Sequence, residues 1–237
     1  MSVDLKDKVV IVTGAGRGIG RSIALSFGRE SSRLVLASRT KSELEKVASE
    51  VKAKGAEALA VPTDLTKEGE VNKLVEIATD SFGRIDILIN NAGIGINAKV
   101  VDMRTEDFES LFDVNVKGVF FCTRAVLPNM IKQRDGVIVN ISSLAGRNAI
   151  SGGAAYCATK WALIGFARSL MLEVRQHNIR VITICPGSVD TSFSHVIGKK
   201  SNILHSEDVA DTVLAAVKMP TRAMVSEIDI RPTNPKS

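Results

Sequence analysis

The sequence predicts an α/β fold, a single doubly wound parallel sheet of about seven strands with helices on both faces. Short apolar runs alternate with longer amphipathic segments along the whole chain. The runs are rich in β-branched residues and mostly non-alternating, which is typical of parallel strands covered on both faces. Parallel neighbours need helical crossovers, so this order favours the doubly wound arrangement. The expected strands are 9–12, 34–37, 58–61, 85–89, 137–139, 181–184 and 228–230.

The segments between these runs have helical periodicity. They comprise residues 41–54, 68–81, 106–133, 154–177 and 207–219, and a further helix is expected to begin near residue 21. Thr40, Thr105 and Ser206 each precede a helical period, so we expect them to be N-cap residues.

The chain shows no Pro/Gly/Ser-rich linker and no internal repeat, so residues 1–237 are expected to form one domain. Residues 188–204 have the weakest periodicity and follow the sixth expected strand. Ligands of such sheets bind at this carboxyl edge, so the segment is expected to be a short substrate lid. A plain surface loop is the alternative.

Composition excludes several classes of protein. No apolar run approaches the ~20 residues that span a bilayer, and residues 1–8 lack the apolar stretch of a signal peptide, so we expect a cytoplasmic protein without membrane partners. The net charge of +5 comes from basic residues spread among acids, with one Trp and one Tyr. This pattern indicates a solvated surface and not a nucleic-acid interface.

The cysteines and histidines show no spacing typical of a disulfide framework or a metal site. Three cysteines without C-x-x-C spacing argue against a disulfide framework, and three scattered histidines lack the spacing of metal ligands. We expect no metal. These residues are Cys122, Cys157, Cys185, His177, His195 and His205.

Residues 13–20, TGAGRGIG, form a glycine-rich segment between the first strand and the first helix. Glycines permit a tight turn and let backbone N–H groups approach a pyrophosphate at the helix N-terminus. The strict G-x-G-x-x-G register is absent, and a plain tight connection is the alternative. The strand before and the helix after favour a dinucleotide-binding Rossmann fold.

The end of the second strand predicts which nicotinamide dinucleotide binds. An acid about 20 residues past the glycine loop would accept the ribose 2′-hydroxyl of NAD, but this chain has Ser38 and Arg39 there. A guanidinium binds a 2′-phosphate through parallel charge-assisted bonds, and Arg17 can approach from the other side. We therefore expect NADP(H). The alternative is that Arg39 only ends a strand in solvent.

The fifth strand is followed by Ser143, and Tyr156 and Lys160 come thirteen and seventeen residues later. Residues i and i+4 lie on one face of a helix, so Tyr156 and Lys160 project together. A phenol is a poor acid-base near neutrality, but a nearby ammonium favours the phenolate and is expected to lower its pKa. Ser143 can then polarise a substrate carbonyl. Asn115 is a helical Asn between apolar neighbours. This context alone favours a buried side-chain amide that makes its hydrogen bonds within the core and has no catalytic role.

In these motifs the chain resembles the short-chain dehydrogenase/reductase family, in its branch of short subunits. The matching motifs are T-G-x-x-x-G-x-G at 13–20, N-N-A-G at 90–93, N-V at 115–116, Ser143 with the Tyr156/Lys160 pair, and P-G at 186–187 with Thr191. They cover most of the chain and follow the family order.

The resemblance implies roles for these residues. Tyr156 would be the general acid-base, Lys160 would lower its pKa and hold the nicotinamide ribose, Ser143 would orient the substrate oxygen, and Asn115 would support a water relay. Asp64 would contact adenine, and the helices that carry Asn115 and Tyr156 would pack between subunits of a homodimer or homotetramer. The expected NADP(H)-binding residues are Gly14, Arg17, Gly18, Ile19, Gly20, Ser38, Arg39, Asp64, Leu65, Asn91, Ala92, Gly93, Tyr156, Lys160, Pro186, Gly187, Val189 and Thr191.

The substrate is less well defined. The family implies hydride transfer between the nicotinamide and a carbonyl or alcohol. Residues 226–235 lack the glycine-rich ending of the 3-oxoacyl-[acyl-carrier-protein] reductases, so a small-carbonyl reductase ranks first and that reductase second. A non-catalytic NADP(H)-binding sensor or scaffold is the alternative of another class. Arg147 either meets a substrate carboxylate or points to solvent, and apolar side chains either form the substrate pocket or pack in the core: Ile94, Ile96, Leu144, Ile150 and Phe193.

Overall fold

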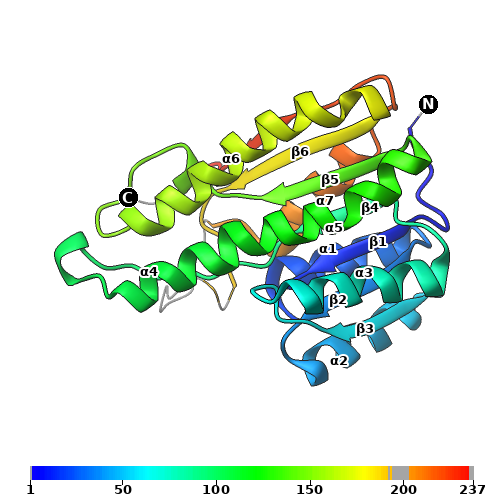
Figure 1. Cartoon of the computed structure of the whole chain (residues 1–237), viewed down its shortest axis with the longest axis horizontal. Helices are drawn as coiled ribbons and strands as arrows, with labels where there is room; N and C mark the ends of the chain where they lie inside the picture. Colours follow the sequence, from blue (N-terminus) through cyan, green and yellow to red (C-terminus); the bar gives the residue numbers. More distant parts are fainter. Residues whose placement is uncertain (1, 192, 194–202, 235–237) are drawn as a thin grey trace.

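The computed structural model describes residues 2–191, 193 and 203–234 and contains one seven-stranded sheet (Figure 1). Its order is β3-β2-β1-β4-β5-β6-β7, and every neighbouring pair is parallel. This confirms the predicted doubly wound Rossmann-type sheet. The strands are β1 Val9–Thr13, β2 Arg33–Ser38, β3 Ala58–Pro62, β4 Ile87–Asn90, β5 Gly136–Ile141, β6 Ile179–Pro186 and β7 Glu227–Ile230.

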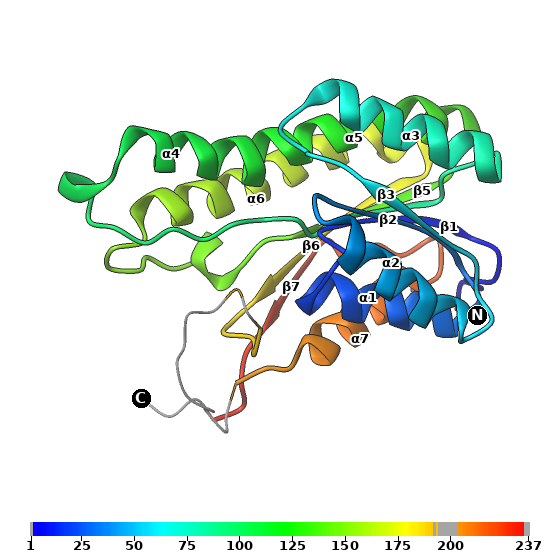
Figure 2. The ribbon, with the colours of Figure 1, turned by 90° about the horizontal axis from the view of Figure 1, so that it is seen from below.

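Helices cover both faces of the sheet. Figure 2 shows α1, α2 and α7 on one face and α3, α4, α5 and α6 on the other. The α-helices in the described part of the chain are α1 Gly18–Arg29, α2 Lys41–Lys52, α3 Glu68–Phe82, α4 Thr105–Phe112, α5 Gly118–Gln133, α6 Ala154–Val174 and α7 Ser206–Val217.

The expected helix over 106–133 is interrupted. A π-helical turn over Asp113–Lys117 separates α4 from α5. Such a turn inserts one extra residue into the helical ladder and occurs frequently at functional sites. The turn contains the fully buried Asn115.

Two of the three expected N-caps are wrong. Thr105 and Ser206 are the first residues of α4 and α7, and the cap positions are held by Arg104 and His205. Thr40 occupies the cap position of α2, but its side chain makes no capping hydrogen bond. At α7 the partner comes from inside the helix, because Asp208 Oδ2 accepts the His205 N–H at 2.8 Å.

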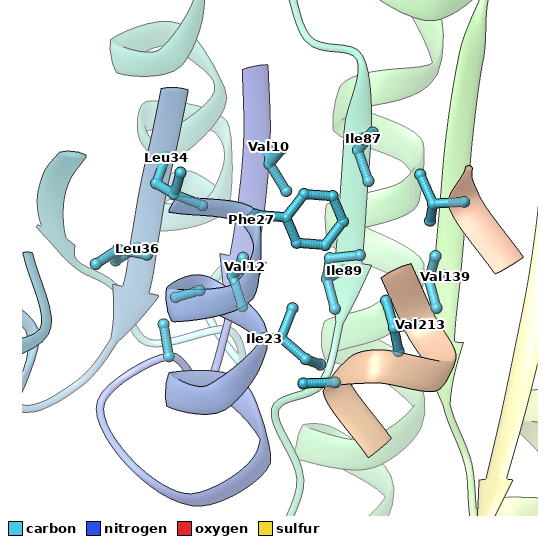
Figure 3. Close-up of a cluster of buried hydrophobic side chains, with 14 of the residues drawn as sticks. Val10, Val12, Ile23, Phe27, Leu34, Leu36, Ile87, Ile89, Val139 and Val213 are labelled. Atoms are coloured by element: carbon cyan, nitrogen blue, oxygen red, sulfur yellow. The ribbon is translucent and has the colours of Figure 1, made fainter. Parts of the chain in front are cut away.

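The central strands β1, β4, β5 and β6 are buried on both faces, so their side chains divide between two hydrophobic clusters. Val10 and Val12 of β1 pack with Phe27 of α1 and Val213 of α7 (Figure 3), whereas Ile11 belongs to the cluster under α3, α5 and α6. This alternation is the period-2 geometry of a strand. It explains why the apolar runs are continuous.

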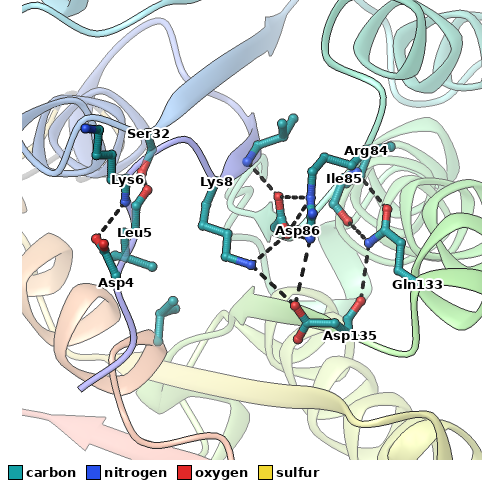
Figure 4. A network of polar contacts seen from close by, with 12 residues as sticks. Asp4, Leu5, Lys6, Lys8, Ser32, Arg84, Ile85, Asp86, Gln133 and Asp135 are labelled. Atoms are coloured by element: carbon teal, nitrogen blue, oxygen red, sulfur yellow. Dashed lines mark hydrogen bonds and ion pairs between the residues drawn. The ribbon is translucent and has the colours of Figure 1, made fainter. Parts of the chain in front are cut away.

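A polar network joins the amino ends of three central strands (Figure 4). Lys8, Asp86 and Asp135 each directly precede a strand, β1, β4 and β5 respectively. The Asp86 side chain is only 3% exposed and accepts the Val9 N–H at 2.9 Å, Lys8 Nζ at 3.1 Å and Arg84 Nη2 at 2.5 Å. One carboxylate therefore fixes the start of β1 relative to β4.

Replacing Asp86 with Ala should destabilise the protein by about 3 kcal/mol, because the buried Val9 N–H and two cations lose their acceptor. Urea unfolding measures this change. Glu76→Ala is the control, since the Lys73–Glu76 pair is more than half exposed and its loss should leave the stability almost unchanged. Equal effects of the two substitutions would contradict a special role of Asp86.

Candidate active site

A cleft of about 1430 Å³ opens at the carboxyl edge of the sheet. It runs from the glycine loop and the end of β2 to the residues that follow β4, β5 and β6. The strand order reverses direction at β1, whose neighbours are β2 and β4, and ligands of open α/β sheets bind at such a point. Most of the expected site residues line this cleft.

The glycine loop is packed against the segment after β4. Gly14 has a φ of 63°, and a Cβ there would lie 2.8 Å from the Ala92 Cα. The Asn91 side-chain amide donates to the carbonyls of Thr13 and Gly14 at 3.0 and 3.2 Å. Only glycine permits both this conformation and this approach. Gly20 lies in α1 against the Gly14 backbone and does not line the cleft, so its contribution is to packing.

One end of the cleft carries the residues expected to select NADP. Arg17, Ser38 and Arg39 all line it, and Ser38 Oγ is buried without a hydrogen-bond partner among the described residues. Nearby, Asp64 is buried enough for desolvation to oppose its charge. Hydrogen bonds from Thr66 and the charges of Lys67 and Arg39 outweigh that effect and lower the Asp64 pKa. This end therefore presents two guanidinium groups and a free hydroxyl.

Ser143, Tyr156 and Lys160 converge in the middle of the cleft. Burial raises the pKa of the Tyr156 phenol, and a hydrogen bond with Ser143 only partly offsets this. Lys160 Nζ donates to the Ile141 carbonyl at 3.1 Å and lies 5.8 Å from the centre of the tyrosine ring. The expected lowering of the Tyr156 pKa is thus not found, because burial dominates and the ammonium is not bonded to the phenol. The phenol remains protonated at neutral pH.

Lys160 is itself strongly affected by burial. Desolvation lowers its pKa from 10.5 to about 8. The ammonium is held on β5 through the Ile141 carbonyl, and a Cβ on Gly93 would lie 3.7 Å from Nζ. Despite its burial, Lys160 lines the cleft.

Asn115 does not line the cleft but holds one of its walls. Its side chain accepts the Ile94 N–H at 2.8 Å and donates to the Ile94 carbonyl at 2.9 Å and to Thr159 Oγ1 at 3.1 Å. These bonds tie the segment after β4 to α6, one turn from Tyr156. The side chain is a satisfied buried amide, as its sequence context suggested, and it also positions the site.

The other end of the cleft is lined by Pro186, Gly187, Val189 and Thr191, as expected. Of the expected lid over 188–204, residues 192 and 194–202 lie outside the described residues. The described ends of that segment are paired, since Asp190 N donates to the Leu204 carbonyl at 2.7 Å.

The residues considered for a substrate pocket divide into two groups. Ile94, Leu144, Ile150 and Phe193 line the cleft, with Phe193 and Tyr156 ring centres 6.2 Å apart. Ile96 and Arg147 do not line it.

Arg147 neither meets the cleft nor points freely to solvent. It bonds Glu227 at 2.5 Å and Asp229 at 3.1 Å, both on β7, and is 26% exposed. The Arg147 guanidinium, which the sequence suggested as a partner for a substrate carboxylate, is therefore paired with the carboxylates of β7.

Several residues that line the cleft were not expected from the sequence. The most informative are Glu43 and Arg231. Glu43 belongs to the first turn of α2, directly after the segment Ser38-Arg39, and this proximity was the available signal. Arg231 follows β7 in a segment whose course the hydrophobic pattern does not determine.

Comparison with known proteins defines the family. Residues 8–202 match the family model for short chain dehydrogenase. An uncharacterized oxidoreductase of Staphylococcus aureus (strain MRSA252) is 37% identical over 229 residues, covering 96% of this chain and 98% of that protein. The chain belongs to the short-chain dehydrogenase family, and is an oxidoreductase of that family.

Two solved structures of similar proteins agree with this. A metagenomic short-chain oxidoreductase in complex with NADP is 36% identical, with a TM-score of 0.88 and coverage of 98% of this chain and 100% of that one. The alcohol dehydrogenase of the archaeon Thermococcus sibiricus, complexed with 5-hydroxy-NADP, is 28% identical, with a TM-score of 0.90 and coverage of 97% and 99%.

Two further observations concern the described residues only. They contain no group of three or more His, Cys, Asp or Glu side chains that could hold a metal ion. None of their helices is long and apolar enough to cross a membrane.

The buried Lys160 ammonium should make stability depend on pH. Below about pH 8 both folded and unfolded chains are protonated, and the full cost of burial applies. Between pH 8 and 10.5 the folded chain loses the proton first, so its free energy of unfolding rises relative to a variant without the lysine. A shift from 10.5 to about 8 corresponds to about 3 kcal/mol.

The stability advantage of Lys160→Met over the wild type should therefore shrink by about 3 kcal/mol between pH 8 and pH 10.5. Chemical unfolding of both proteins across this range measures it. A difference that does not vary with pH would show that the ammonium is not desolvated in the folded protein.

Proposed function

We propose that this protein is an NADP(H)-dependent oxidoreductase that transfers a hydride between the nicotinamide and a carbonyl or alcohol, with Tyr156 as general acid-base. The observation that carries the proposal is the convergence of Ser143, Tyr156 and Lys160 in one cleft with the glycine loop. The family and the two NADP-complexed structures described above support it.

The residues of the cleft fit the cofactor. Gly14 lets the glycine loop pack closely against Ala92. The loop then leads directly into α1, and a pyrophosphate would bind to the backbone N–H groups at the start of that helix. Arg17, Arg39 and the partnerless Ser38 hydroxyl would hold the 2′-phosphate. Asp64 and Leu65 line the cleft near that end, and Pro186, Gly187, Val189 and Thr191 would hold the nicotinamide end.

When bound, NADPH would supply a hydride to the carbonyl carbon. The substrate oxygen then requires a proton, and the Tyr156 phenol is protonated because burial raises its pKa. Ser143 lines the same cleft and would orient the same oxygen. Lys160 would hold the nicotinamide ribose and would add a positive charge beside the tyrosine as the phenolate forms. Asn115 keeps the wall of the cleft in place through its two hydrogen bonds with Ile94. We also propose that Asn115 supports a relay of water molecules that delivers protons to Lys160.

The substrate is proposed to be a small carbonyl or alcohol. Ile94, Leu144, Ile150 and Phe193 line the region around Tyr156, so its walls are largely apolar. Arg147, the cation considered for a substrate carboxylate, is paired on β7 instead.

We further propose a homodimer or homotetramer. Phe120 of α5 is 39% exposed, and Trp161 and Leu172 of α6 are 54% and 58% exposed. Large apolar side chains on the outer surface of these two helices fit subunit packing along them.

Tyr156→Phe keeps the ring and removes only the hydroxyl that donates the proton. Turnover should fall by at least about a thousandfold, while the dissociation constant of NADPH should change less than about threefold. Steady-state kinetics and a fluorescence titration with NADPH measure the two quantities. Retained turnover would refute the role of Tyr156, and loss of NADPH binding would indicate a disrupted cleft instead.

A substrate panel with NADPH should show oxidation of the cofactor with small ketones or aldehydes and no preference for a 3-oxoacyl thioester. The reaction is followed by the loss of the NADPH absorbance band that NADP⁺ lacks. Selective turnover of the thioester would favour a 3-oxoacyl-[acyl-carrier-protein] reductase. Tight NADPH binding without turnover of any compound would favour a sensor or scaffold.

A further inference from the structure

Glu43 is an acid in the part of the cleft that is otherwise positively charged. It lies in the first turn of α2, is half-buried, and lines the cleft beside Ser38, Arg39 and Thr40. A Cβ built on Gly16 would lie 2.8 Å from Glu43 Oε2 and 3.3 Å from Ser38 Oγ. The carboxylate and the serine hydroxyl therefore sit against the same point of the glycine loop.

The charged side chains of Arg17, Arg39 and Glu43 form no direct bond with one another, although the charge of Arg39 acts at longer range on Asp64. Among the described residues, the side chains of Arg17, Arg39 and Glu43 have neither an ion-pair partner within 4.0 Å nor a hydrogen bond. Other acids of α2 are paired, Glu45 with Lys41 and Glu50 with Arg21. An unpaired carboxylate next to a partnerless buried hydroxyl is thus available to a ligand.

We propose that Glu43 is a specificity-determining residue that faces the adenosine ribose 2′ position and limits the preference for NADP over NAD. The inference rests on the proposed function. Arg17 and Arg39 attract a 2′-phosphate, whereas the Glu43 carboxylate repels it. The same carboxylate accepts a hydrogen bond from the 2′-hydroxyl of NAD, the role that an acid at the end of β2 plays in NAD-binding folds. The subsite therefore has groups suited to either dinucleotide.

Glu43→Gln removes the negative charge and keeps the size of the side chain. We expect NADP⁺ to bind about tenfold more tightly, because one repulsion of the phosphate disappears in a solvent-accessible cleft. NAD⁺ should bind a few-fold more weakly, because an amide is a poorer acceptor than a carboxylate. Isothermal titration calorimetry of both oxidised cofactors measures the two dissociation constants without any turnover.

Matched variants separate this role from a change in overall charge or folding. Glu45→Gln makes the same change on the same helix, outside the cleft, and should leave the ratio of the two dissociation constants unchanged. Glu43→Ala should change the ratio in the same direction as Glu43→Gln. The gain in NADP⁺ affinity should shrink at high ionic strength, because salt screens the repulsion.

The outcomes distinguish the two proposals. A ratio that is the same in the wild type, Glu43→Gln and Glu43→Ala would overturn the role of Glu43 alone. Binding of neither dinucleotide to the wild type would overturn the proposed function and this inference with it. Arg39→Ala tests the phosphate site separately, since it should weaken NADP⁺ more than NAD⁺ whatever Glu43 does.

Discussion

The cleft depends on one hydroxyl group, that of Thr13 at the end of β1. It donates to the Ile89 carbonyl at 3.1 Å and accepts the N–H groups of Asn91 and Ala92 at 3.0 and 3.1 Å. These bonds continue the contact between β1 and β4 past the point where their ladder ends. The glycine loop on one side and the N-N-A-G segment on the other are thereby held at a fixed separation.

The polar groups beside this contact are costly to bury, and the structure offsets the cost locally. Asn115 has all its bonds satisfied by Ile94 and Thr159, so it rigidifies the wall without leaving an unpaired group. Lys160 is different, because its single bond to the Ile141 carbonyl does not replace its lost hydration. The candidate site is thus less stable than it would be with an apolar side chain at position 160, which is common at functional sites.

How much the sequence predicted depends on the physical origin of each feature. Strands and most helices were predictable, because burial on both faces of the sheet imposes continuous apolar runs and helical periodicity. The candidate site residues from the glycine loop to Thr191 were proposed from motif order, and most of them line one cleft. The π-helical turn at Asn115 was not, since one inserted residue barely changes the periodicity. The raised pKa of Tyr156 and the pairing of Arg147 with β7 depend on burial and distance, which sequence spacing does not encode.

The network around Asp86 lies at the opposite end of the sheet from the cleft, and this separation has a consequence for how such a protein can change. The starts of β1, β4 and β5 are anchored by side chains that take no part in forming the cleft. Loops at the carboxyl edge can therefore be exchanged without disturbing that anchor. The same framework can therefore accept loops that bind other substrates, by natural variation or by design. Any loss of stability caused by a new loop is then confined to one end of the molecule.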